Sequence, residues 1–301
     1  MTKGNKSIPT ISIIMPTYNR AGLIIETIES IQRQTYSDWE LIIVDDGSTD
    51  ETEEKIRQFA DERIQFIKAG RIGIGGRIKN IGIQHSSGTF IAFSDSDDPW
   101  EPTKLEKQVN ALERYPGAGF CLTGGFMFEK IDQPQKYFYK QKEGEKFADI
   151  LIPLFNSGIA GYVQALMLRR ECLATAGHFR EVKSFSDLDF IASLASHFKA
   201  VILYEPLVYR RLHESNYITN NWAKSYDEGI ALIREYRPRL PVAISRNAFF
   251  RIYINYGEKS LLYKKRWQAV TKFLKAWQYK PFSMVPIKKM LKAFVCYLQG
   301  K

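Results

Sequence analysis

Acidic side chains gather in two short segments of this 301-residue sequence. Asp95, Asp97 and Asp98 fall within one tetrapeptide, and Asp45 and Asp46 form a second group. Carboxylates this close repel one another unless a cation shares their field. A hard divalent ion such as Mg²⁺ or Mn²⁺ takes one or two carboxylates and completes its coordination with water and phosphate oxygens. We therefore expect metal-assisted chemistry on a phosphorylated substrate, with a solvated acidic turn that caps the next helix as the alternative.

The elements that must position these carboxylates alternate between short apolar runs and longer segments of helical periodicity. Strands are predicted at 11–15, 39–44, 64–68 and 90–94, and helices at 21–34, 77–85 and 103–115. This alternation predicts βαβ units and a mainly parallel sheet. Both acidic groups then follow the carboxyl ends of strands, where open α/β sheets bind their ligands.

The pattern is less regular further along the chain. Strands are predicted near 120–123, 162–168 and 201–204, a helix over 184–197, and helices only after about residue 225. We expect a domain over residues 1–220 that binds the substrate and carries the catalytic groups, followed by a helical, basic region over 221–301.

Four blocks of sequence occur in a specific order: residues 13–19 (IIMPTYN), 43–50 (IVDDGSTD), 80–82 (NIG) and 93–98 (FSDSDD). In this order and spacing the chain resembles the family 2 glycosyltransferases of the GT-A fold, over about residues 8 to 215. The resemblance implies an α/β, GT-A-like fold with a mainly parallel central sheet. It also implies an inverting enzyme that uses a nucleotide diphosphate sugar in cell-surface polysaccharide synthesis.

The resemblance assigns the first two blocks to the nucleotide. Pro16, Thr17 and Tyr18 would line its pocket, with the Tyr18 ring against the base. Asp46, with Asp45 beside it, would accept a hydrogen bond from the base. UDP is the favoured nucleotide, because Tyr18 and Asp46 fit a pyrimidine, and GDP and dTDP are the alternatives. A turn before a capped helix is the alternative interpretation of the two carboxylates.

The resemblance assigns the fourth block to the sugar and the metal. Asp95 would face the ribose or the sugar, while Asp97 and Asp98 would hold Mn²⁺ or Mg²⁺ on the diphosphate. His213, in a segment similar to the family's R-x-H motif, would complete the metal site, and Arg210 would bind phosphate. A surface histidine without a role is the alternative for His213.

Lys79 and Asn80 stand where the family often has Arg-Asn, and both are expected to contact the donor. Lysine keeps the positive charge but loses the bidentate contact that arginine makes. The preceding glycine-rich segment, 70–76, lacks both the Walker ending and the G-x-G-x-x-G spacing. We interpret it as a flexible loop near the donor.

Residues 185–190 (FSDLDF) correspond to the family's acidic segment at the start of a helix. Asp187 is the candidate general base by this alignment, and Asp189 would orient the acceptor. An inverting transfer needs one carboxylate to take the proton of the acceptor hydroxyl as it attacks the anomeric carbon. A capping box between Ser184 and Asp187 is the alternative.

The net charge of +10 lies entirely in the last part of the chain, because residues 261–301 hold ten Lys and Arg and no acid. Apolar residues fall on one side of two helical segments there, and lysines on the other. Such helices bind the surface of an anionic bilayer or pack their apolar stripe on the rest of the protein. We favour peripheral membrane attachment, and we expect no nucleic-acid partner because no recognised binding motif accompanies the charge.

Other features point to the compartment and the partners. The three cysteines are odd in number and widely spaced, which indicates neither a disulfide framework nor a zinc site. The sequence shows no secretion signal and no apolar run that would span a bilayer. We therefore expect a cytoplasmic protein, on the inner face of the membrane if attached, with a glycan or lipid-linked acceptor.

Two other classes of protein remain as alternatives. A nucleotidyltransferase that makes an activated sugar also uses acidic strand ends and a metal, but a glycine-rich, basic loop would follow its first strand, where Pro16 to Asn19 stand here. A catalytically inactive carbohydrate-binding scaffold would not need Asp46, Asp97 and Asp187.

Overall fold

The computed structural model describes residues 10–129, 133–139, 142–212 and 222–298. By its internal contacts the chain divides into two compact units. The first comprises Met1–Leu151 and Ile159–Glu214, and the second comprises Ile152–Gly158 and Ser215–Lys301. The short segment 152–158 thus packs with the C-terminal helices, although the chain on either side of it belongs to the first unit.

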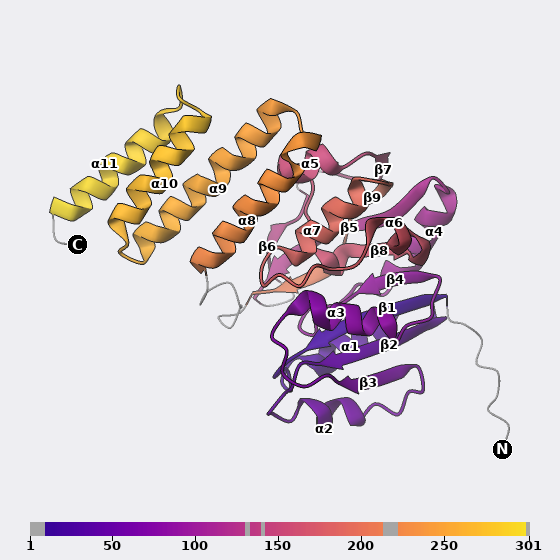
Figure 1. Cartoon of the computed structure of the whole chain (residues 1–301). Coiled ribbons are helices and arrows are strands. Elements are labelled where there is room, and N and C mark those ends of the chain that lie inside the picture. Colours follow the sequence, from indigo (N-terminus) through magenta and orange to yellow (C-terminus); the bar gives the residue numbers. More distant parts are fainter. Residues whose placement is uncertain (1–9, 130–132, 140–141, 213–221, 299–301) are drawn as a thin grey trace, which may run out of the picture. The chain divides into compact units, whose positions relative to one another are not determined.

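A nine-stranded sheet forms the centre of the first unit, in the order β3-β2-β1-β4-β8-β5-β9-β7, with β6 beside β5 (Figure 1). The strands are β1 (Ile11–Thr17), β2 (Trp39–Asp45), β3 (Ile64–Lys68), β4 (Phe90–Phe93), β5 (Ala118–Phe128), β6 (Pro134–Tyr137), β7 (Glu145–Ala148), β8 (Leu166–Arg169) and β9 (Lys199–Arg211). Strands β1 to β4 pair in parallel, whereas β8 lies antiparallel between β4 and β5. The expected α/β architecture is confirmed, with a mixed sheet beyond β4.

Helices cover both faces of the parallel half of the sheet. The helices of this unit are α1 (Ile24–Gln32), α2 (Thr52–Arg57), α3 (Gly75–Gln84), α4 (Lys104–Arg114), α6 (Leu173–Ala176) and α7 (Ser186–Ala195), with short 3₁₀ turns at Val163–Ala165 and Arg170–Cys172. Ile13 and Met15 of β1 belong to the core that includes α1 and α4, while Ile14 points to the opposite face, against α3. Because both faces of the inner strands β1, β2 and β4 are buried, these strands are mostly apolar, whereas the edge strand β3 is only partly buried.

The second half of the sheet differs most from the sequence-based expectation. The pattern does not indicate β6 or β7, and it predicts β9 over 201–204 only, because Glu205 and Pro206 interrupt the apolar run. The strand continues because it pairs with β5 through a register shift at Gly124. A Cβ on Gly124 would lie 2.4 Å from the Tyr204 carbonyl oxygen, so only glycine admits this approach.

The second unit is helical, as expected from about residue 225 onward. Its helices are α8 (Trp222–Tyr236), α9 (Val242–Leu262), α10 (Arg266–Tyr279) and α11 (Met284–Leu298), with α5 (Leu151–Phe155) and a 3₁₀ turn at Arg237–Arg239. Successive helices α8 to α11 lie side by side (Figure 1). Aromatic stacking joins them, as between Tyr226 and Tyr256 and between Phe249 and Tyr279. In the described part of the chain, no helix is both long enough and apolar enough to span a bilayer.

A buried lysine in the first unit links its stability to pH. Lys104 of α4 is 0% exposed, with its Nζ 3.7 Å from the Trp100 ring centroid and 2.8 Å from Gln108 Oε1. Burial lowers the pKa of Lys104 to about 7. An unfolded lysine titrates at about 10.4, so the unfolded chain binds more protons between these two values. The free energy of unfolding should therefore rise as the pH increases above 7.

We predict that Lys104→Met raises the melting temperature at pH 7 and flattens its dependence on pH. Methionine fills a similar volume without a charge that must be desolvated. The gain should be about 2–4 °C for each kcal/mol recovered. Thermal denaturation between pH 6 and 8.5 measures both effects, and the control is Lys107→Met, at a partly exposed lysine of the same helix that pairs with Glu205. An unchanged slope in Lys104→Met would contradict the assignment.

Candidate active site

The turns after β1 and β2 are joined by side-chain hydrogen bonds. The amide of Asn19 donates to Ser48 Oγ at 2.9 Å, and the amide of Thr49 donates to Asn19 Oδ1 at 2.8 Å. Ser48 in turn donates to both oxygens of Asp45 through its amide and its hydroxyl. Asn19 has φ 49°, a left-handed conformation that asparagine tolerates better than most residues. Asp45 is predicted to lie beside the nucleotide. In the structure its carboxylate accepts hydrogen bonds from Ser48 and so stabilises the turn that follows β2.

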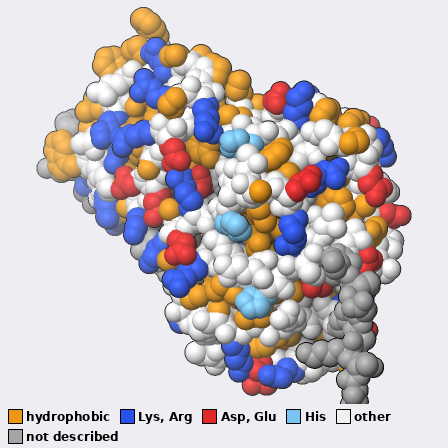
Figure 2. All heavy atoms as spheres, turned by 45° about the vertical axis from the view of Figure 1, so that its right-hand side comes forward, with side chains coloured by type: hydrophobic (Ala, Val, Ile, Leu, Met, Phe, Trp, Pro, Cys, Tyr) orange, Lys and Arg blue, Asp and Glu red, His pale blue; other side chains and the backbone are white. Residues whose placement is uncertain are grey.

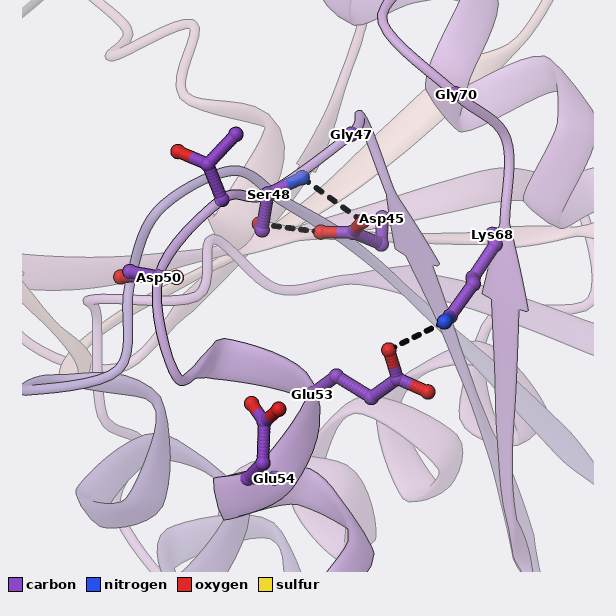
Figure 3. A pocket seen from close by; sticks show the side chains of 9 residues that line it. Asp45, Gly47, Ser48, Asp50, Glu53, Glu54, Lys68 and Gly70 are labelled. Carbon is purple, nitrogen blue, oxygen red and sulfur yellow. Dashed lines mark hydrogen bonds and ion pairs between the residues drawn. The ribbon is translucent and has the colours of Figure 1, made fainter.

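A hollow of about 280 Å³ lies beside this turn (Figure 3). Asp45 and Ser48 contact each other on one side of it, and on another side Glu53 and Lys68 form an ion pair at 2.5 Å. Gly70 brings the start of the glycine-rich segment to the same hollow. The hollow therefore separates α2 from the loop that follows β3.

The ends of β1 and β2 bring the predicted nucleotide residues together. Pro16 pairs in register with Val44, and Thr17 with Asp45. The amide of Asp46 donates to the Thr17 carbonyl at 2.9 Å, which continues the ladder beyond the strands. The structure therefore places Pro16 and Thr17 beside the two aspartates.

Asp46 anchors the glycine-rich loop. Its Oδ1 accepts hydrogen bonds from the amides of Ile72, at 2.6 Å, and Gly73, at 3.0 Å. The guanidinium of Arg71 pairs with Oδ2 of the same carboxylate. Arg71 Cζ also lies 3.8 Å from the centroid of the Tyr18 ring, which is 36% exposed. Arg71 therefore contacts both side chains that are predicted to bind the base.

Residues 70–76 are predicted from the sequence to form a flexible loop near the donor, and the role of Arg71 is not predicted. The glycines in this loop and in the turn after β2 are the sequence feature that could have indicated the contact between them. Gly70 and Gly73 have φ of 70° and 71°, and Gly47 has φ 77°. A Cβ on Gly47 would lie 2.8 Å from the Arg71 amide nitrogen. Glycine is required at Gly47 because the loop packs directly on the turn.

An ion pair joins α3 to α7 at the exit of β4. Lys79 Nζ lies 2.7 Å from Asp187 Oδ1, although the two residues are 108 positions apart. The Lys79 side chain is 7% exposed and that of Asp187 is 35% exposed. Burial disfavours the charged lysine, but Asp187 and Asp95 outweigh it and raise the pKa of Lys79. Lys79 therefore stays protonated between two carboxylates.

Asp95 lies close enough to Lys79 and Asp187 for their charges to change its pKa. Burial raises the pKa of Asp95 to about 6, with Lys79 opposing this rise and Asp187 and Asp97 adding to it. Three predicted residues, Lys79, Asp95 and Asp187, thus meet at one place in the first unit. A substrate or ion of positive charge is favoured where such carboxylates gather.

The two remaining aspartates of the turn have different surroundings. Asp98 is 3% exposed, and its oxygens accept hydrogen bonds from the Arg211 amide at 2.8 Å and from Gln164 Nε2 at 3.0 Å. Burial and the neighbouring carboxylates Asp95 and Asp97 raise the pKa of Asp98 well above its ordinary value. The Asp97 side chain is 15% exposed, and its Oδ2 lies 3.3 Å from Arg20 Nε. Asp98 thus holds the turn in place, while Asp97 lies nearer to solvent.

Two basic residues of β9 flank the acidic turn. Arg211 donates through Nε to the Asp97 carbonyl at 3.2 Å, and it pairs with Glu26 of α1. Arg210, predicted to bind phosphate, lies with its Cζ 4.9 Å from the centroid of the Tyr162 ring, and its charge acts on both Asp95 and Asp98. His213, the predicted third metal ligand, lies outside the described residues.

Two predicted site residues are engaged by protein partners. Both oxygens of Asp189 pair with Arg180, through Nε and Nη2, each at 2.6 Å. The Asn80 side chain donates through Nδ2 to the Phe179 carbonyl at 2.8 Å, and its Oδ1 accepts from the Phe179 backbone amide at 3.0 Å. Asn80 of α3 and Asp189 of α7 therefore fix Phe179 and Arg180, in the segment just before α7.

The carboxylate oxygens at this site suit a metal ion that takes most of its ligands from water and substrate. Across the described ranges, no three His, Cys, Asp or Glu side chains converge as a complete metal site. Asp97 is nevertheless a hard anionic oxygen ligand beside a partly buried second carboxylate, Asp95. Mg²⁺ is commonly held by one or two carboxylates together with water and substrate phosphates. The residues present therefore fit a metal that arrives with its phosphorylated substrate.

Comparison with known proteins identifies the class of protein that this site belongs to. Residues 12–170 match the family described as "Glycosyl transferase family 2". The chain is 41% identical over 136 residues to the UDP-Glc:alpha-D-GlcNAc-diphosphoundecaprenol beta-1,3-glucosyltransferase WfgD of Escherichia coli, a match of 44% of this chain and 54% of that protein. It is 30% identical over 220 residues to the putative teichuronic acid biosynthesis glycosyltransferase TuaG of Bacillus subtilis, a match of 71% and 83%. The chain belongs to glycosyl transferase family 2.

The structural comparison concerns the fold. The crystal structure of S. aureus TarS 1-349 in complex with UDP-GlcNAc has a TM-score of 0.71 and 17% sequence identity, and the match covers 97% of this chain and 92% of that one. At this identity the likeness concerns the fold. The predicted GT-A-like α/β fold with a helical C-terminal appendage is confirmed.

The position of α3 depends on two glycines that have no room for a side chain. A Cβ on Gly82 would lie 2.4 Å from Ile14 Cγ2, and one on Gly76 would lie 2.5 Å from the Arg180 carbonyl oxygen. Helix α3 therefore packs directly on β1 and on the segment before α7. This close packing sets the position of Lys79 between Asp95 and Asp187.

We predict that Gly82→Ala lowers the free energy of unfolding by about 1–3 kcal/mol, because the new methyl group overpacks the contact with β1. Gly75→Ala is the matched control at the start of the same helix, where a Cβ would have no neighbour within 4 Å. It should be neutral or slightly stabilising. Urea denaturation compares the two variants. Equal stabilities would show that α3 can shift without cost.

Proposed function

We propose that this chain is a metal-dependent, inverting glycosyltransferase that moves a sugar from a nucleotide diphosphate donor to a hydroxyl group of a glycan or lipid-linked acceptor. One observation carries the proposal. The ion pair between Lys79 and Asp187 holds a partly exposed carboxylate beside the acidic turn that contains Asp95 and Asp97. An acid–base group and a diphosphate-binding turn are thus available at one site.

The donor side of the proposal rests on the ends of β1 and β2. We infer that the base lies against the Tyr18 ring and bonds to Asp46, and that Arg71 moves or shares these contacts when the nucleotide binds. UDP is the favoured nucleotide. WfgD is by name a UDP-Glc-dependent glucosyltransferase, and the TarS structure contains UDP-GlcNAc, which supports this choice.

Asp97 is the residue that we propose as a ligand of Mn²⁺ or Mg²⁺. When bound, such an ion neutralises the charge that develops on the departing nucleotide diphosphate. Asp98 would support this site indirectly, because its own oxygens hold the Arg211 amide and Gln164. Arg210 supplies a second positive charge close to Asp95 and Asp98.

Asp187 is the proposed general base. Its Oδ1 accepts from Lys79 at 2.7 Å and from Ser186 at 3.4 Å, whereas Oδ2 accepts no hydrogen bond from the residues that the structure describes. Oδ2 would take the proton of the acceptor hydroxyl while that oxygen forms a bond to the anomeric carbon. The bond from the anomeric carbon to the diphosphate breaks on the opposite face, so the configuration inverts.

The acceptor class follows from the relatives rather than from the site itself. WfgD is named for its acceptor alpha-D-GlcNAc-diphosphoundecaprenol, and TuaG is named as a putative glycosyltransferase of teichuronic acid biosynthesis. We propose by analogy a lipid-linked or growing surface-glycan acceptor, used in the cytoplasm at the inner face of the membrane.

We predict that Asp187→Asn lowers kcat by about 10²- to 10⁴-fold, the usual contribution of a positioned general base. Donor affinity should be nearly unchanged, because the substitution leaves the acidic turn and the nucleotide residues intact. Release of UDP from the donor in the presence of acceptor measures kcat, and isothermal titration measures donor binding. Asp149→Asn, an exposed aspartate outside the site, is the control. Wild-type turnover in Asp187→Asn would remove Asp187 as the base.

We predict a different result for Asp97→Asn. Loss of a hard anionic ligand should weaken Mn²⁺-dependent donor binding by at least about 10-fold, because even second-shell substitutions have effects of this size. Donor binding without metal should change little. Thermal-shift titrations with UDP in the presence of Mn²⁺ or EDTA separate the two cases. The same stabilisation in wild type and variant would exclude Asp97 as the ligand.

A further inference from the structure

Helix α10 of the second unit exposes a stripe of large apolar side chains. Trp267 is 77% exposed, Leu274 is 45% exposed and Trp277 is 39% exposed. The opposite side of the helix is fully buried through Ala269, Phe273 and Ala276 and carries the packing within the unit. The stripe therefore leaves a large part of its apolar surface uncovered by the described residues.

The ends of this helix continue the apolar surface. Leu262, in the last turn of α9, is 72% exposed, and Phe282, between α10 and α11, is 99% exposed. Met284 and Leu291 of α11 are 58% and 60% exposed. We call these residues, with the α10 stripe, the apolar surface of the second unit. Soluble monomers rarely expose so many large apolar groups without a partner.

Lysines surround the apolar surface. Lys264, Lys275, Lys280 and Lys288 are exposed, and residues 261–301 contain no acidic residue. Figure 2 shows basic and apolar side chains next to one another over the C-terminal helices, at the upper left of the view. Aromatic and aliphatic groups flanked by lysines suit the boundary between lipid headgroups and acyl chains.

We propose that the apolar surface of the second unit is a docking site for an anionic phospholipid bilayer. Trp267, Trp277 and Phe282 enter the headgroup region, and the lysines contact lipid phosphates. Charge selects this partner over a second copy of the chain, because a symmetric dimer would place the same lysines opposite one another. The inference goes beyond the proposed sugar transfer, since none of these residues lies in the candidate active site.

Co-sedimentation with vesicles tests the proposal. The protein should bind vesicles of 30% phosphatidylglycerol in phosphatidylcholine, bind pure phosphatidylcholine weakly, and dissociate as the salt concentration rises. Each lysine removed should weaken binding by about fivefold. We expect a loss of about 100-fold for Lys264→Gln/Lys275→Gln/Lys288→Gln. The control is Lys146→Gln/Lys199→Gln, which removes exposed lysines of the first unit. No sedimentation of the wild type at low salt would overturn the proposal.

Tryptophan fluorescence tests which side chains enter the bilayer. Trp39, Trp100 and Trp222 are at most 5% exposed, so only Trp267 and Trp277 can contact lipid. Brominated lipids should quench the emission of the wild type, and they should leave that of Trp267→Phe/Trp277→Phe unchanged. Trp267→Ser/Phe282→Ser should bind vesicles at least tenfold more weakly, whereas Ile152→Ser, at an apolar residue 42% exposed on α5, should bind normally.

Two outcomes would contradict the proposal. One is equal quenching in the wild type and in the double phenylalanine variant. The other is a stable dimer in solution that Trp267→Ser/Phe282→Ser converts to a monomer, because the apolar surface would then bind a second copy. UDP binding in the presence of Mn²⁺, measured on the same variants, should match the wild type. Loss of vesicle binding can thus be distinguished from failure of the proposed transferase function.

Discussion

The structure of the candidate site depends on one buried cation between carboxylates. Lys79 Nζ lies 2.7 Å from Asp187 Oδ1. The charges of Asp187 and Asp95 raise the pKa of Lys79 although burial opposes this. Without this charge, acidic side chains from β4 and α7 would face one another in a partly buried place. The family often has arginine at this position, and the single contact made by lysine leaves Oδ2 of Asp187 without a hydrogen bond from the described residues.

The same ion pair explains the packing around it. Helix α3 must approach β1 closely for Lys79 to reach Asp187, which accounts for glycine at position 82. Asn80, the residue after Lys79, forms hydrogen bonds with both the amide and the carbonyl group of Phe179. The Phe179 ring packs at 4.0 Å on Phe190 of α7, so apolar stacking and polar contacts hold the two helices in one arrangement.

The nucleotide side of the site follows a different principle. Short polar side chains satisfy the backbone of two adjacent turns, and the carboxylate of Asp46 gathers the loop at 71–73. These contacts are local and polar, so a ligand with matching donors can replace them at little cost. Near Lys79 one charge serves both Asp187 and Asp95, so disturbing that network would leave carboxylates facing one another and would cost more.

The sequence by itself determined the positions along the chain of the strands in the parallel half, the acidic turns at their carboxyl ends and the family. These features are encoded locally, in apolar runs, turn residues and short motifs. Only the tertiary structure decided which partner each charge has. It gave Lys79 to Asp187, Arg180 to Asp189 and Arg71 to Asp46. These partners meet through packing, whether they are 9 or 108 positions apart, and the long β9 likewise exists through its pairing with β5. Neither kind of contact leaves a periodic trace in the sequence.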